Sequence, residues 1–67
     1  MTRTGKCKVW NRERGFGFLT TDDDGRDVFT HCVDLMIDRD YLDVGEVVSF
    51  KIEKSDRGPR AVNVEPI

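Results

Sequence analysis

The sequence predicts an all-β fold in which five antiparallel strands close into a barrel. Three observations support this prediction. Apolar residues recur at every second position in five short segments, turn-forming residues separate these segments, and no segment keeps a helical period beyond one turn. Closing the sheet removes its exposed strand edges, which is economical in a chain of 67 residues. A chain of this length forms a single domain, residues 1–67, with a modest core.

The first strand is expected at Lys6–Asn11. Cys7 and Val9 alternate there with lysines and Trp10, which is the pattern of a half-buried strand. Cys7 and Val9 are therefore expected to face the core, and Trp10 the outside. The polar turn Asn11–Gly15 ends in glycine and leads into the next strand.

The second strand is expected at Phe16–Thr20 and carries Phe16 and Phe18 on one face. Gly17 leaves a flat floor between the two rings. The cluster Asp22–Gly25 follows as a solvated turn, because aspartate and glycine are frequent turn residues. Its aspartates lack the ordered ligand spacing of a calcium loop.

The third strand is expected at Asp27–Cys32, with Phe29 and His31 on the same face. Val33–Val44 follows without a clean helical or strand period, and it holds four aspartates. We expect it to be a long connection containing one short helical turn. Gly45 closes this connection.

The last two strands are expected at Glu46–Glu53 and Arg60–Glu65, with the turn Ser55–Pro59 between them. Their alternating residues that point inward are Val48, Phe50, Ile52, Val62 and Val64. These two strands complete the predicted barrel.

The net charge of −2, taken alone, argues against a nucleic-acid partner, but the charges are unevenly distributed. Residues 1–19 carry five basic residues against Glu13 alone. Residues 20–46 carry nine acidic residues against two arginines, and residues 47–67 are nearly balanced. Cations are therefore concentrated in the predicted first two strands and the turn between them.

A row of four rings lies outside the predicted core, formed by Phe16, Phe18, Phe29 and His31. Leu19, Val28 and Thr30 take the opposite, core-facing side of the same strands, which disfavours the alternative that the rings form one larger core. An aromatic ring stacks on any base and contributes about 1–3 kcal/mol per base. Cations beside the row contact phosphates or base edges. The nearest such cations are Lys8 and Arg14, followed by Lys6, Arg57 and Arg60.

Four segments resemble the bacterial cold-shock proteins in order and spacing: Gly5–Asn11, Arg14–Leu19, Asp27–His31 and Gly58–Val64. Arg14–Leu19 matches the first ribonucleoprotein motif of that family, and Val28–Cys32 the second. The resemblance implies a five-stranded antiparallel Greek-key β-barrel, an OB-fold of the cold-shock type. It also implies binding of single-stranded RNA or DNA with low sequence specificity, and a role as RNA chaperone or transcript-level regulator.

The resemblance also implies roles for individual residues. It assigns base stacking to Phe16, Phe18, Phe29 and His31. It assigns polar contacts with the nucleic acid to Lys8, Asn11, Arg14, Asp27 and Arg57. Val9 stands where the family has its stacking tryptophan, so Trp10 is the candidate for a displaced stacking ring. Cys32 replaces another ring, and Tyr41 is the candidate for the family's loop aromatic. Losing two stacking contacts would cost about 2–6 kcal/mol of binding energy.

Other chemistries fit the sequence poorly. Adjacent strand residues point to opposite faces, so His31 and Cys32 do not converge on one metal, and no fourth ligand has suitable spacing. No serine or cysteine nucleophile pairs with the lone histidine, so we expect neither an enzyme nor a cofactor. The small size disfavours a small-molecule substrate. Without a signal peptide or membrane span, we expect a cytoplasmic monomer with reduced cysteines and no membrane partner.

One alternative from another class stays open: a protein-interaction barrel with a weakened nucleic-acid face. The acidic connection Asp34–Glu46 would then contact a basic partner, since barrels of this class are reused for many ligands.

Overall fold

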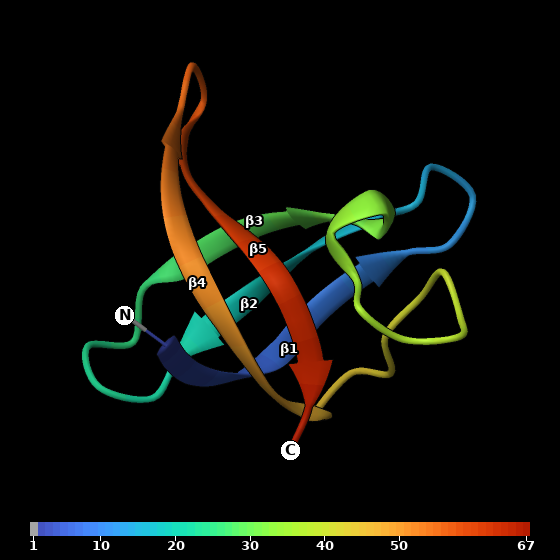
Figure 1. Cartoon of the computed structure of the whole chain (residues 1–67), viewed down its shortest axis with the longest axis horizontal. Coiled ribbons are helices and arrows are strands. Elements are labelled where there is room, and N and C mark those ends of the chain that lie inside the picture. The colour runs from blue at the N-terminus through green and yellow to red at the C-terminus, as the bar shows by residue number, and fades with distance from the viewer. Residues whose placement is uncertain (1) are drawn as a thin grey trace.

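The computed structural model describes residues 2–67 and contains five strands and one short 3₁₀ helix (Figure 1). These elements are β1 (Thr2–Asn11), β2 (Phe16–Thr21), β3 (Asp27–His31), η1 (Cys32–Asp34), β4 (Val47–Ser55) and β5 (Gly58–Pro66). All five predicted strands are present. The largest difference is in β1, which begins at Thr2 instead of Lys6. The helix η1 is the helical turn predicted for the long connection, and its first residue, Cys32, was expected to belong to the third strand.

The strands form a closed barrel in the order β1-β2-β3-β5-β4, which confirms the predicted architecture (Figure 1). The pairs β1–β2, β1–β4, β2–β3 and β4–β5 are antiparallel. β3 and β5 are parallel and meet through Phe29 and Arg60. An odd number of strands cannot alternate direction all the way around a ring, so a five-stranded barrel needs a parallel pair where it closes.

A β-bulge in β1 corrects the predicted directions of two side chains. Cys7 pairs with Leu19 and Val9 with Phe18, so β1 has one extra residue, Lys8, opposite β2. A bulge shifts the alternation of side chains by one position. Val9, predicted to be internal, is 48% exposed, and Trp10, predicted to face outward, packs against the core.

A second irregularity lies in β5. Ser49 pairs with Glu65 and Lys51 with Val62, so β5 has one more residue than β4 over this stretch. Asn63 within it has a φ of 52°, a left-handed conformation that asparagine tolerates better than most residues. The predicted inward positions of Val62 and Val64 are confirmed, and the shift buries Ala61 as well.

The core fills the barrel interior and continues under the long connection. Its buried members are Cys7, Leu19, Val28, Leu35, Leu42, Val48, Phe50, Ala61 and Val64. Burial raises the pKa of the Cys7 thiol and so favours its protonated form. Within residues 2–67, no helix is long and apolar enough to cross a membrane.

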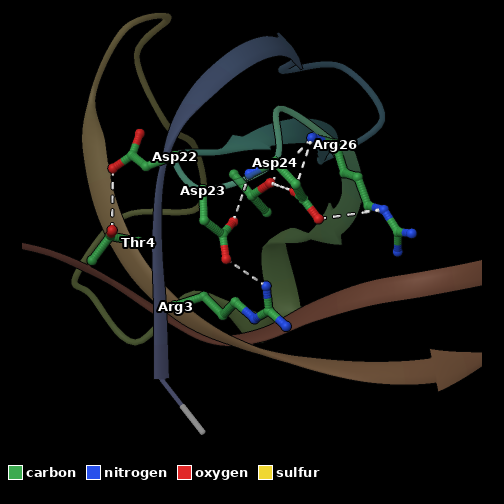
Figure 2. A network of polar contacts seen from close by, with 7 residues as sticks. Arg3, Thr4, Asp22, Asp23, Asp24 and Arg26 are labelled. Atoms are coloured by element: carbon green, nitrogen blue, oxygen red, sulfur yellow. Dashed lines mark hydrogen bonds and ion pairs between the residues drawn. The ribbon is translucent and has the colours of Figure 1, made fainter.

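The aspartates of the β2–β3 turn are held by neighbouring donors (Figure 2). Nη1 of Arg3 lies 2.8 Å from Asp23 Oδ2, and Nε of Arg26 lies 3.4 Å from Asp24 Oδ2. A hydrogen bond from the Thr21 hydroxyl lowers the pKa of Asp24. These contacts tie the turn to β1 and β2 and offset part of its negative charge.

Candidate nucleic-acid interface

The four predicted rings share the outer surface of β2 and β3. The antiparallel register places Phe16 opposite His31 and Phe18 opposite Phe29. The ring centroids of Phe16 and Phe29 are 5.8 Å apart with an interplanar angle of 32°, and those of Phe18 and Phe29 are 5.9 Å apart at 74°. Phe18 is 36% exposed even though it is a large apolar side chain. The rings therefore form one connected aromatic row that is accessible from solvent.

This row lies in a groove of about 340 Å³, which we call the aromatic groove. Its lining residues are Arg14, Phe16, Phe18, Phe29, His31 and Arg57. All six were proposed from the sequence. Neither Arg14 nor Arg57 forms an ion pair with another part of residues 2–67, so both guanidinium groups are available to an anionic ligand.

The backbone after β3 fixes the imidazole of His31. The N–H of Val33 donates a hydrogen bond to His31 Nδ1 at 3.2 Å, and Cys32 Sγ lies 3.6 Å from the same nitrogen. Because Nδ1 accepts from the backbone, the proton of the neutral ring is on Nε2. His31 thus caps η1 and presents a flat ring of fixed orientation at one end of the row.

The β1–β2 turn positions Arg14. Oδ1 of Asn11 accepts from the Arg14 backbone N–H at 3.1 Å, and the Asn11 carbonyl accepts from the Gly15 N–H at 2.8 Å. Gly15 has a φ of 72°, where a side chain would be strained. Cys32 packs beside this glycine, with its Sγ 2.9 Å from the point where a β-carbon would stand. Asn11, predicted to contact nucleic acid, does not line the aromatic groove and instead supports its rim.

Lys8 and Asp27 form an ion pair with each other outside the aromatic groove. Lys8 Nζ lies 2.9 Å from Asp27 Oδ2. The hydrogen bond from Lys8 lowers the pKa of Asp27, and the hydroxyl of Thr20 is a weaker donor to the same carboxylate. Lys8 therefore has a competing acceptor, whereas Arg14 and Arg57 have none among residues 2–67.

Trp10 lies away from the aromatic groove. Its ring is half-buried against the core, and its Nε1 is buried without a hydrogen-bond partner in residues 2–67. The bulge at Lys8 explains this position, because it reverses the faces of the strand to which the following side chains point. The indole does not share the surface occupied by Phe16 and Phe18, as its candidate role as a displaced stacking ring would require.

Tyr41, the candidate loop aromatic, is covered by cations. The guanidinium carbon of Arg12 lies 3.9 Å from the centre of the Tyr41 ring, and that of Arg39 lies 5.3 Å away. Arg39 also pairs with Glu46 and Asp43. These contacts hold the long connection to the β1–β2 turn, and Tyr41 does not line the aromatic groove. In the part of the chain that the structure describes, no three His, Cys, Asp or Glu residues are grouped to hold a metal.

Comparison with known proteins identifies relatives over nearly the whole chain. Residues 3–67 match the family described as "'Cold-shock' DNA-binding domain". The chain is 48% identical over 65 residues to cold shock-like protein CspE of Bacillus anthracis, and the match covers 96% of each chain. It is 42% identical over 62 residues to cold shock-like protein CspG of Escherichia coli K12, covering 91% of this chain and 89% of that protein.

A solved structure shows the same fold at lower sequence similarity. A structure described as drosophila Unr CSD456 matches 100% of this chain with a TM-score of 0.83 and 18% identity, and the match covers 27% of that longer chain. At this identity the match concerns the fold alone.

Proposed function

This chain belongs to the cold-shock domain family, whose members generally bind nucleic acid, and from that premise we propose that it binds single-stranded RNA or DNA by stacking bases on the aromatic groove. The observation that carries the proposal is the connected row of solvent-accessible rings, which shares its groove with Arg14 and Arg57, two arginines that form no ion pair within residues 2–67. Bases of a duplex are already stacked on one another, so such a row favours single strands.

The groove chemistry supports low sequence specificity. Three of its six lining residues are phenylalanines, which stack on any base, and the arginines add contacts to phosphates. A protein that holds unstacked bases favours the open form of a folded transcript, because ligands shift an equilibrium toward the state that they bind better. An RNA-chaperone or transcript-level regulatory role follows from this binding mode. We also propose that the domain acts as a cytoplasmic monomer without an enzymatic step.

A competition titration tests the proposal. Binding of a labelled seven-nucleotide oligo-U or oligo-dT would be followed by fluorescence anisotropy, with unlabelled single strand or a blunt duplex long enough to stay paired at the assay temperature as competitor. We expect the single strand to compete and the duplex to fail at the same concentration. Equal competition by both would mean that the protein recognises the phosphate backbone, and the stacking proposal would be wrong.

The chaperone role needs its own measurement. A short RNA hairpin with a fluorophore and a quencher at its ends would be melted in increasing protein concentration. We expect the midpoint temperature of the hairpin to fall as protein is added. An unchanged midpoint at saturating protein would overturn the chaperone role and leave single-strand binding in place.

The rival function, binding of a basic protein through the long acidic connection, has weaker support. Arg39 pairs with Asp43 and Glu46, and Arg60 pairs with Asp34, so part of the negative charge of this segment is neutralised within the molecule. The arginines of the aromatic groove are not neutralised in this way, which favours the nucleic-acid proposal.

A further inference from the structure

We infer that a second groove, at the end of the aromatic row, selects guanine and that Arg60 is the residue that reads this base. The inference rests on the proposed function, because it assigns one specific position on the same single-strand path.

The second groove shares two lining residues with the aromatic groove. It has a volume of about 260 Å³ and is lined by Phe29, Ser55, Asp56, Arg57 and Arg60. Phe29 and Arg57 also line the aromatic groove. Phe29 is the residue that pairs with Arg60 where β3 meets β5. A strand that follows the aromatic row past Phe29 therefore enters the second groove.

The guanidinium of Arg60 is held in place by one carboxylate. Its Nε and Nη2 lie 2.8 and 2.7 Å from Oδ2 of Asp34, whose side chain is only 14% exposed. An arginine has five N–H donors, and these contacts use one from each of the two nitrogens. Both N–H groups of Nη1 and one of Nη2 are left. With 37% of its side chain exposed, Arg60 offers these donors as a fork to a ligand in the groove.

Guanine is the base that matches this fork. Its N7 and O6 are adjacent acceptors, and the bidentate contact of arginine to this edge is the commonest specific base contact. Adenine has an amino donor in place of O6, and uracil has no N7. In a single strand this edge is free to be read.

Asp56 favours a base edge over a phosphate as the ligand of the second groove. Asp56 is exposed and forms no ion pair within residues 2–67, so its carboxylate is available as a hydrogen-bond acceptor in the groove. A phosphate of the nucleic-acid backbone has no donor for this acceptor. The N1–H and N2–H groups of guanine are donors that a carboxylate accepts. Arginine and aspartate together therefore complement the acceptors and donors of guanine.

Guanine scanning tests the inference. Seven oligo-U heptamers, each with one guanine at a different position, would be compared with all-U in anisotropy titrations. At one position guanine should raise affinity by about 5- to 150-fold, the range expected of a bidentate arginine contact. Adenine or cytosine at that position should give no such gain.

A matched pair of variants links the preference to Arg60. Arg60→Lys keeps the charge near Asp34 but removes the planar fork, so the ratio of guanine-containing to all-U affinity should fall to about one. Arg3→Lys is the control. Like Arg60, Arg3 is partly exposed (39%) and pairs with an aspartate, Asp23, at 2.8 Å. Arg3 does not line the second groove. Arg3→Lys should keep the gain in affinity that guanine gives over all-U.

The remaining outcomes overturn the inference in different ways. Tight binding of oligo-U with no gain from guanine at any position would refute the guanine site and leave the stacking proposal standing. A uniform loss across all sequences in Arg60→Lys would show a phosphate contact instead of base reading. Failure of every oligonucleotide to bind would refute both proposals together.

Discussion

The indole of Trp10 lies against the backbone of Gly17: a β-carbon at position 17 would come within 2.6 Å of Trp10 Cε3 and closer still to the carbonyl oxygen of Val9. Gly17 lies between the two phenylalanines of β2, so this close approach packs the strand that carries them against Trp10. The absence of a side chain at Gly17 therefore makes room for Trp10 to pack beneath the row.

This contact predicts that Gly17→Ala destabilises the fold. The new methyl group must displace a backbone carbonyl, and overpacking of this kind costs about 1–3 kcal/mol. Urea unfolding followed by far-UV circular dichroism measures the change. An unfolding free energy equal to that of the wild type would show that Trp10 moves aside freely, and that the contact does not fix the position of the row.

Trp10→Ala should reduce the free energy of unfolding by about 2–3 kcal/mol, because the ring is half-buried and its removal costs less than that of a fully buried one. Oligonucleotide binding by the folded variant should stay within about twofold of the wild type, because Trp10 does not line the aromatic groove. Trp10→Phe is the matched control. It keeps an aromatic ring and removes the unpaired Nε1–H, so its cost should be smaller. A tenfold loss of oligonucleotide affinity by Trp10→Ala at unchanged stability would instead show that the indole contacts a base.

The salt dependence of binding should reflect two free arginines. Each phosphate contact on a single strand contributes a slope of about −0.7 to a plot of log K against log salt concentration, so Arg14 and Arg57 together predict about −1.4. Arg14→Gln and Arg57→Gln should each reduce the slope by about 0.7. Lys8→Gln should change it less, because Lys8 already pairs with Asp27. A larger change for Lys8→Gln than for either arginine would contradict this assignment.

The ion pair of Arg39 and Glu46 should make stability depend on pH. The hydrogen bond from Arg39 lowers the pKa of Glu46 in the folded state. A lowered pKa contributes stability above the unfolded value of about 4.3, and this contribution is lost as pH falls through the folded pKa. Glu46→Gln should therefore be less stable than the wild type at neutral pH, with a gap that closes in acid.

Urea titrations of both proteins across the acid range measure this gap. Glu53→Gln is the control, because Glu53 is exposed on β4 and forms no ion pair within residues 2–67. Its difference from the wild type should be small at every pH. A gap for Glu46→Gln that stays constant down to about pH 2.5 would mean that its carboxylate is not linked to folding.

Strand alternation was enough to predict the five strands and the row of rings on the outer surface of β2 and β3. Phe18 and Phe29 alternate with Leu19 and Val28, so the sequence separates the outer row from the core without knowledge of the fold. The two bulges could not be predicted in this way. A one-residue insertion in a ladder depends on the partner strand, and it reversed the expected directions of Val9 and Trp10.

Contacts between segments that are distant in the chain could not be predicted from the sequence either. Asp34 lies in the long connection and Arg60 at the start of β5, and nothing in their spacing indicates that they pair. Arg12 and Tyr41 meet in the same way, from the β1–β2 turn and the long connection. Such pairs depend on how the barrel closes, which strand patterns alone do not specify.

Base stacking on the aromatic row is tested most directly by comparing Phe18→Ala, Phe29→Ala and the control Val47→Ala in titrations of labelled oligo-U and oligo-dT. Val47 is 41% exposed, lies on β4 and is absent from the lining of the aromatic groove. Each phenylalanine variant should lose about 1–3 kcal/mol of binding free energy with a native circular dichroism spectrum, and Val47→Ala should bind like the wild type. Wild-type affinity in both phenylalanine variants would contradict the central claim that bases stack on this row.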